Sequence, residues 1–308
     1  MLLKNQYFCR EKNQSVSNLL AAILYYLVIL PVSKLPFSVL YAFSDFLFFI
    51  LYRIIGYRRK VVESNIRNSF PDYTPEKRKE IVEAFYRHLC DLVVESLKGF
   101  SISEEEAKKR VICLNPEVLD AYYDKGQRVI LFGGHINNWE MFAVAVSFWI
   151  KHKPVGIYAE LTNHFFNEKI KKSRSKYGLL MIPRKIVKDF FANPTPELTA
   201  TIFAIDQSPS NPNKCYWTTF LNQDTGVTYG AELYAKEYNQ PVVYGRINKI
   251  KRGHYSFEFI PVMDEPKNTS FGEIMEIGTR MLEKDILATP QYWLWSHRRW
   301  KNKRPAGL

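Results

Sequence analysis

From about residue 111 onward, short apolar runs alternate with amphipathic segments, and this pattern constrains the fold more than any other feature of the chain. Short apolar runs bounded by turn residues are typical of buried strands, whereas apolar residues spaced three and four apart predict helices. The expected strands are 127–133, 153–159, 179–183, 200–206 and 241–247, with 254–261 as an added strand, and the expected helices are 139–150, 163–177, 185–192, 228–239 and 271–287. This alternation predicts an α/β fold with a mostly parallel central sheet flanked by helices.

Two apolar runs, residues 19–30 and 35–57, precede this region. The first run would cover roughly 18 Å as a helix, which is less than the hydrocarbon core of about 30 Å, and the second contains Asp45. Basic residues flank both sides of the pair, which favours re-entrant or interfacial helices over one clean span. We therefore expect residues 1–60 to form a membrane-anchoring helical segment and 61–308 an α/β domain. The alternative is a pair of core helices in a soluble helical cap.

Residues 74–99 predict a long helix, with Thr74 as N-cap, Pro75 at the first helical position and Gly99 just past the end. Its apolar residues recur at helical spacing and are expected to face a core. They are Ile81, Phe85, Leu89, Leu92 and Val93.

The net charge of +12 favours acidic partners: anionic lipid, an acidic carrier protein or nucleic acid. No recognised nucleic-acid-binding motif accompanies the basic residues, so nucleic acid is not expected as a partner. The four cysteines are widely scattered, and no pair has the spacing of a zinc or redox site. We expect reduced thiols.

The turn after the first long strand, Gly133-Gly134-His135-Ile136-Asn137-Asn138-Trp139-Glu140, is the candidate for chemistry. Two glycines let the backbone turn tightly, so that His135 stands at the carboxyl end of the strand and a helix begins near Asn138. A histidine can take a proton from an alcohol near neutral pH, and a carboxylate such as Glu140 could orient it. The alternative is that Asn137-x-x-Glu140 is only a capping box.

The motifs of the chain, in their order, resemble the lysophospholipid acyltransferase superfamily and more narrowly the bacterial lipid A late acyltransferases. The similarity covers nearly the whole chain. The matching features are the apolar N-terminus, residues 58–66 (RRKVVESNI), Phe70-Pro71, His135-x4-Glu140, residues 174–178 (RSKYG) and 182–184 (IPR), Asp206-Gln207 and residues 293–301 (WLWSHRRWK).

This resemblance implies that His135 activates an acceptor hydroxyl, that Glu140 is its dyad partner, and that the hydroxyl attacks a thioester directly. The implied donor is acyl carrier protein, or acyl-CoA, and the implied acceptor is a hydroxyl of a lipid A precursor or related glycolipid. The expected location is the cell inner membrane, with the catalytic domain facing the cytoplasm. The resemblance implies no metal and no bound organic cofactor. Relatives often carry an Arg beside the Tyr that ends the next strand, whereas this chain has Tyr158-Ala159-Glu160.

Five further residues are candidates for substrate binding: Asn138, Arg174, Arg184, Asp206 and Gln207. Asp206 and Gln207 could bind acceptor hydroxyls, or Asp206 could only cap a turn. Arg184 could meet phosphate, and the basic segment 168–176 could meet an acidic carrier or anionic head groups; either could instead be solvated surface. The aromatic and basic tail from Trp293 suits a membrane surface, although its tryptophans could cover the core.

Three rival functions follow from these patterns. The same dyad could act on a different acceptor, such as an aminolipid, a lysophospholipid or a pigment alcohol. The chain could be a lipid-binding protein without catalysis. A metallohydrolase is disfavoured because His135 has no partner histidine at ligand spacing.

Overall fold

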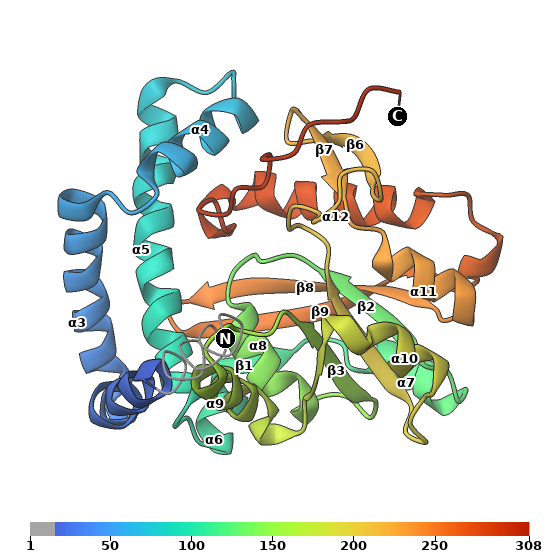
Figure 1. The fold of residues 1–308 in the computed structure, drawn as a ribbon, viewed down its shortest axis with the longest axis horizontal. Helices are drawn as coiled ribbons and strands as arrows, with labels where there is room; N and C mark the ends of the chain where they lie inside the picture. The colour runs from blue at the N-terminus through green and yellow to red at the C-terminus, as the bar shows by residue number, and fades with distance from the viewer. Residues whose placement is uncertain (1–15, 308) are drawn as a thin grey trace, which may run out of the picture.

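The computed structural model describes residues 16–307, and its centre is a seven-stranded sheet in the order β1-β9-β8-β2-β5-β3-β4, shown in Figure 1. Strands β8, β2, β5, β3 and β4 run parallel, while β9 is antiparallel to β8 and parallel to β1. The expected mostly parallel sheet is confirmed. The strands are β1 (Val111–Cys113), β2 (Val129–Gly133), β3 (Lys153–Tyr158), β4 (Leu180–Pro183), β5 (Thr199–Ala204), β8 (Val242–Lys251) and β9 (His254–Met263).

Helices cover both faces of the sheet, and every helix expected from the sequence is present with its ends moved by a few residues. The helices are α2 (Leu30–Lys34), α3 (Phe37–Phe48), α4 (Arg59–Ser69), α5 (Pro75–Gly99), α6 (Glu104–Arg110), α7 (Glu117–Asp124), α8 (Trp139–Ala145), α9 (His164–Arg174), α10 (Val187–Ala192), α11 (Gly230–Tyr238) and α12 (Glu273–Ala288). Single 3₁₀ turns lie at Val146–Phe148, Ser175–Tyr177, Arg184–Ile186, Pro266–Asn268 and Pro290–Tyr292.

Four features were not expected from the sequence: the short strand β1, the short helices α6 and α7, and a separate antiparallel hairpin formed by β6 (Tyr216–Phe220) and β7 (Gln223–Val227). The helices are short, and β6 and β7 carry polar residues among their apolar ones. Short helices and strands of mixed polarity both lack the long apolar periodicity by which a sequence indicates secondary structure.

The side chains of β2 alternate between two apolar cores, one on each face of the sheet. Ile130 and Phe132 pack with the core that includes α4, α5, α12 and the C-terminal tail. Val129 and Leu131 pack with the core on the side of α6, α7 and α8. A strand buried on both faces is the arrangement that helices on both sides of a parallel sheet require.

Two long apolar helices lie at one side of the molecule, Val16–Lys34 and Phe37–Ile55, and by length and composition each could cross a membrane. Each contains a π-helical stretch, at Tyr25–Ile29 and Phe49–Ile55. Figure 1 shows α3 running beside α5 at the left of the sheet. Large apolar side chains on the outer faces are exposed, among them Leu27 at 72% and Phe46 at 60%. This exposed apolar surface indicates membrane association.

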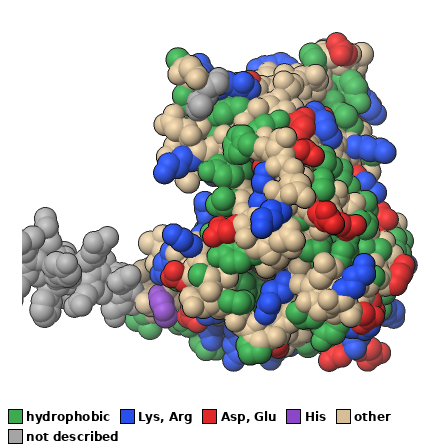
Figure 2. Space-filling model, turned by 90° about the vertical axis from the view of Figure 1, so that its right-hand side faces the viewer, with side chains coloured by type: hydrophobic (Ala, Val, Ile, Leu, Met, Phe, Trp, Pro, Cys, Tyr) green, Lys and Arg blue, Asp and Glu red, His purple; other side chains and the backbone are tan. Residues whose placement is uncertain are grey.

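The opposite side of the molecule has a different surface. Figure 2 shows acidic and basic side chains scattered among apolar ones over that face. The apolar surface is therefore concentrated on the two N-terminal helices rather than spread over the molecule.

Asp45, the acidic residue inside the second apolar run, is largely exposed but forms an ion pair with the rest of the protein. Its carboxylate pairs with Arg252 in the β8–β9 turn at 2.7 Å, and Arg252 also donates to the buried Asp91 of α5 at 2.7 Å. Ser44 donates to Asp91 as well, at 2.8 Å. The charge that would be costly in lipid is therefore paired with Arg252 in the turn between β8 and β9. The division into segments 1–60 and 61–308 stays a prediction.

Four of the five apolar α5 residues expected in the core are buried or half-buried, and Val93 is not. Its side chain is 38% exposed. Val93 lies on the α5 face that turns from the core toward the N-terminal helices, so its helical spacing alone did not place it correctly.

We expect Arg252→Met to lower the stability of the folded protein by roughly 1–3 kcal/mol, because it leaves the buried Asp91 carboxylate with a weaker set of partners. Asp45→Asn is the matched control, because Asp45 is 61% exposed and an exposed pair contributes about 0–1 kcal/mol. Thermal unfolding in detergent measures both. Equal melting temperatures for the two variants would contradict this account of the contact.

Candidate active site

His135 and Asp206 occupy equivalent positions after neighbouring strands. β2 and β5 are parallel, with Gly133 opposite Ala204, and each chain continues two residues beyond that pair to reach His135 or Asp206. The two side chains therefore meet at the carboxyl edge of the sheet, where sites in open α/β folds form. Nδ1 of His135 lies 2.7 Å from Oδ1 of Asp206.

The Asp206 carboxylate is buried and accepts hydrogen bonds on both oxygens. Oδ2 accepts from the backbone N–H of His135 at 2.7 Å and from the indole N–H of Trp293 at 2.8 Å, while Oδ1 faces the imidazole. These contacts fix the orientation of the carboxylate. Each oxygen therefore has at least one partner within the site, and the substrate-binding role expected for Asp206 stays a prediction.

The two charges shift each other's pKa. Burial alone would raise the pKa of Asp206, but the histidine and the hydrogen bonds outweigh burial and lower it to about 2. Burial alone would lower the pKa of His135, but the charge and hydrogen bond of Asp206 outweigh burial and leave this pKa above its usual value. Asp206 is thus a carboxylate at neutral pH, and it favours the proton on Nδ1 of His135.

With Nδ1–H donating to Asp206, the other ring nitrogen, Nε2, is the one free to accept a proton. The Gln207 side-chain nitrogen lies 3.2 Å from Nε2. The ring of Trp139 packs edge-on against the imidazole, with the two ring centres 5.0 Å apart. The site therefore presents a fixed imidazole with its basic nitrogen outward, the arrangement of a general base.

The two asparagines between His135 and Glu140 break the chain direction as expected. Asn137 adopts a left-handed conformation, with φ of 56°, and its side chain donates to the carbonyl of Ile247. Asn138 is the N-cap of α8, its Oδ1 accepting from the N–H of Met141 at 2.9 Å. Asn138 also donates to the buried Glu95 of α5, so its side chain has a structural role in these contacts.

The capping-box alternative for Glu140 is wrong, because the N-cap is Asn138 and the N–H of Asn137 donates to the carbonyl of Tyr292. Glu140 instead forms a two-pronged ion pair with Arg174 of α9, at 2.8 and 2.5 Å. Among residues 16–307, the hydrogen-bond partner of the His135 ring on the Nδ1 side is Asp206, not Glu140. The dyad role expected for Glu140 stays a prediction, and it would act through charge rather than through this bond.

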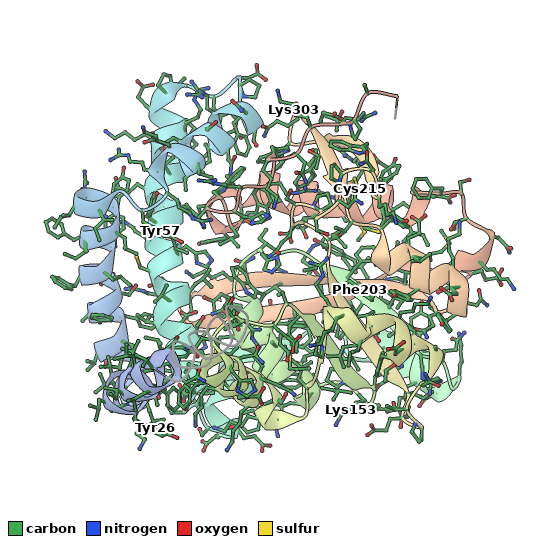
Figure 3. All side chains as sticks on the ribbon, viewed as in Figure 1. Tyr26, Tyr57, Lys153, Phe203, Cys215 and Lys303 are labelled. Atoms are coloured by element: carbon green, nitrogen blue, oxygen red, sulfur yellow. The ribbon has the colours of Figure 1, made fainter. Side chains whose placement is uncertain are left out.

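An apolar cavity of about 180 Å³, which we call the inner cavity, opens beside His135 between the sheet and α8. Glu140 and Arg174 line it together with His135. Apolar lining residues include Leu131, Phe142, Ala143, Met181, Ile202 and Phe203. Phe203, labelled in Figure 3, comes from β5 and lies near the centre of the molecule. The cavity could hold a hydrocarbon chain with its polar end at His135.

Arg184 does not join this cluster. It is exposed and follows β4, the edge strand, which lies three strands, or about 14 Å, from β2 at the usual strand spacing. Its neighbour Lys185 pairs with Glu160 at 2.6 Å. Neither Glu160 nor Lys185 lines the inner cavity.

The tail and residues 58–66, which are far apart in sequence, lie together. Nδ2 of Asn65 donates to the carbonyls of Trp295 and His297, at 2.9 and 3.0 Å, and Arg58 donates to the carbonyl of Ser296 at 3.0 Å. Trp293 and Trp295 are buried, so these two cover the core rather than a membrane surface. The tail thereby places Trp293 on Asp206.

Sequence reasoning missed the Asp206–His135 bond and the Trp293 donor. The equal two-residue offset of His135 and Asp206 from their strands could have indicated the first, once β2 and β5 were known to be neighbours. Nothing in the residue spacing indicates that Trp293 donates a hydrogen bond to Asp206.

Within the part of the chain that the structure describes, no three His, Cys, Asp or Glu residues form a group able to hold a metal ion.

Comparisons with known proteins agree with these features. The model of the bacterial lipid A biosynthesis acyltransferase family matches residues 10–302. The chain is 19% identical over 252 residues to the lipid A biosynthesis palmitoleoyltransferase of Escherichia coli (strain K12), covering 81% of this chain and 80% of that protein. It is equally similar to the lipid A biosynthesis acyltransferase of Shigella flexneri.

A base must be unprotonated to act, and the pKa of His135 is raised. We therefore expect kcat/KM to fall as the pH drops through a value above about 6.5, the ordinary value for histidine. The pH dependence of kcat/KM measures this directly. A fall centred below about 6 would contradict the assignment of His135, paired with Asp206, as the base.

Proposed function

The chain belongs to the bacterial lipid A biosynthesis acyltransferase family, and on that premise we propose that His135 is the general base that activates the acceptor hydroxyl. The protein is an acyltransferase of lipid A biosynthesis, so it uses an acyl donor and a lipid acceptor. The observation that carries the proposal is the imidazole held by Asp206 with Nε2 facing outward beside an apolar cavity.

In the proposed reaction, Nε2 of His135 takes the proton of the acceptor hydroxyl while the oxygen attacks the thioester carbonyl carbon. The C=O bond opens to an oxyanion. This intermediate collapses, the carbon–sulfur bond breaks, and the departing thiolate takes the proton from the imidazolium. The products are an ester and a free thiol, and no acyl-enzyme forms.

Asp206 supports both halves of this cycle. Its hydrogen bond to Nδ1 keeps the proton off Nε2 before attack, and its negative charge stabilises the imidazolium afterwards. The buried Trp293 keeps the carboxylate pointed at the ring. Asp206 is in this proposal a positioning and charge-stabilising residue rather than a ligand for substrate.

Glu140 and Arg174 act together in the proposal. The charge of Glu140 also helps to raise the pKa of His135, so it favours the imidazolium without contacting the ring. Glu140 holds Arg174 in the wall of the inner cavity, and Nη1 of Arg174 makes no hydrogen bond within residues 16–307. A fixed guanidinium there can stabilise the oxyanion.

The inner cavity would hold the acyl chain of the donor. It is lined mainly by apolar side chains, and His135 and Arg174 stand at its polar end. A thioester placed with its chain inside would present its carbonyl to these two residues. Filling the cavity would then limit the length of the chain that is transferred.

We assign the donor to acyl carrier protein, with acyl-CoA as the alternative. Lys171 and Lys172 of α9 lie close in sequence to Arg174, and their positive charge suits an acidic carrier. The two apolar helices would hold the protein at the cell inner membrane, with one face in the lipid and the other packed on α5, and the catalytic domain would face the cytoplasm, where such donors are made.

One observation keeps a related function in view. The Arg that relatives often have beside the strand-ending Tyr is absent here, where the chain reads Tyr158-Ala159-Glu160 and Glu160 pairs with Lys185. A site with a different charge there could take a hydroxyl of a related glycolipid rather than that of a lipid A precursor itself. The chemistry at His135 would be unchanged.

We expect His135→Ala to lower the transfer rate by about 10²–10⁴-fold, the usual effect of losing a general base. The assay is formation of acylated lipid A precursor from a dodecanoyl thioester of acyl carrier protein. His164→Ala is the matched control, because this histidine is exposed on α9. Near-normal transfer by a folded His135→Ala variant would contradict the proposal.

A further inference from the structure

A second apolar cavity, about 400 Å³, lies on the other side of Glu140 and Arg174 from the inner cavity. We call it the outer cavity. One wall comes from α5, with Leu89 and Val93, and the facing wall comes from α9, with Phe166 and Ile170. Ile29 of the first apolar helix and Leu294 of the tail complete it.

The two cavities share three residues, Trp139, Glu140 and Arg174. The indole and the ion pair therefore form a partition, with the inner cavity on one side and the outer cavity on the other. His135 packs against this partition through Trp139, and the N–H of Leu294 donates to the carbonyl of His135 at 3.2 Å. His135 lines the inner cavity, while Trp139 and Leu294, which line the outer cavity, contact His135.

The outer cavity is continuous with the surface that indicates membrane association. The first apolar helix packs on α9 through Tyr25 and Phe165, whose ring centres are 5.7 Å apart, and Lys169 of α9 donates to the hydroxyl of Tyr26 at 2.9 Å. Tyr26, labelled in Figure 3, lies with that helix at the lower left. Leu27, two residues before Ile29, is 72% exposed.

We propose that the outer cavity holds a hydrocarbon chain of the membrane-borne lipid acceptor, while the donor's acyl chain occupies the inner cavity. This inference rests on the proposed function. It assigns one chain to each side of the Trp139, Glu140 and Arg174 partition.

The positions of the two cavities indicate which substrate chain each cavity would hold. An acceptor anchored in the bilayer reaches the site from the apolar helices, and the outer cavity is the one that Ile29 lines. A donor carried by a soluble protein does not need that route. The inner cavity is lined instead by sheet residues such as Ile202 and Phe203. The half-exposed Val93 belongs to the wall of the outer cavity.

The partition also serves the chemistry. An acceptor chain in the outer cavity would hold the acceptor near His135 without competing for the space that the thioester chain needs. Binding energy from a remote chain can in this way orient the reacting hydroxyl.

The test fills each cavity separately in the full-length protein. Val93→Trp extends a large side chain from an exposed position into the mouth of the outer cavity, and Ile170→Trp fills it from the opposite wall. Ala143→Leu projects into the inner cavity from α8. Leu233→Trp on α11 is the matched control, because Leu233 is 45% exposed and lines neither cavity.

The KM values for donor and acceptor are measured with dodecanoyl acyl carrier protein and a lipid A precursor in mixed micelles, after thermal unfolding confirms that each variant folds. We expect Val93→Trp and Ile170→Trp to raise the acceptor KM about tenfold with the donor KM unchanged. We expect Ala143→Leu to raise the donor KM, and Leu233→Trp to change neither.

Two results would overturn the inference while leaving the proposed function in place. One is a raised donor KM in the outer-cavity variants, which would give the outer cavity to the donor. The other is that Val93→Trp and Ile170→Trp both leave the donor KM and the acceptor KM unchanged. Failure of the wild-type protein to acylate the precursor would instead overturn the proposed function, and the assignment of chains with it.

Discussion

The carboxylate of Asp206 joins three parts of the chain that are far apart in sequence. It receives the backbone N–H and the imidazole of His135 from the end of β2, and the indole N–H of Trp293 from the tail. Because all these groups are buried or half-buried, the loss of any one would leave a polar atom without its partner. The sheet edge, the turn before α8 and the C-terminal tail are therefore held in one arrangement by a single side chain.

The elements around this contact set the environment of the imidazole. Residues 58–66 hold the tail through Asn65, the tail holds Trp293 on Asp206, and Asp206 holds His135. On the other side, Glu140 and Arg174 separate two apolar cavities, and the apolar helices lie beside the outer one. In the proposed assignment, the same polar centre would serve a soluble donor from the sheet side and a membrane lipid from the helix side. Such an arrangement would let one domain bring two hydrophobic substrates together without exposing both chains to water.

Much of the fold could be predicted from the sequence, because buried parallel strands and amphipathic helices leave strong patterns. The short helix α7 and the β6–β7 hairpin leave weak ones and were missed. His135 could be identified from its turn, but its partner could not. The sequence places Glu140 close along the chain, whereas Asp206 is 71 residues away and is brought to the ring by strand pairing. Val93 shows the same limit of sequence analysis. Helical spacing predicts which residues share one face of a helix, but it does not show whether other elements cover that face.

The rates of Asp206→Asn and Glu140→Gln in single-turnover transfer, each scaled to the folded fraction, test the central claim most directly. Asn at 206 removes the charge and favours the wrong imidazole tautomer, and the account predicts a loss on the order of 10⁴-fold. Gln at 140 removes a charge that does not contact the ring, and the account predicts a smaller loss, about 10²-fold. A larger loss for Glu140→Gln than for Asp206→Asn would contradict the account and make Glu140 the partner on which His135 depends.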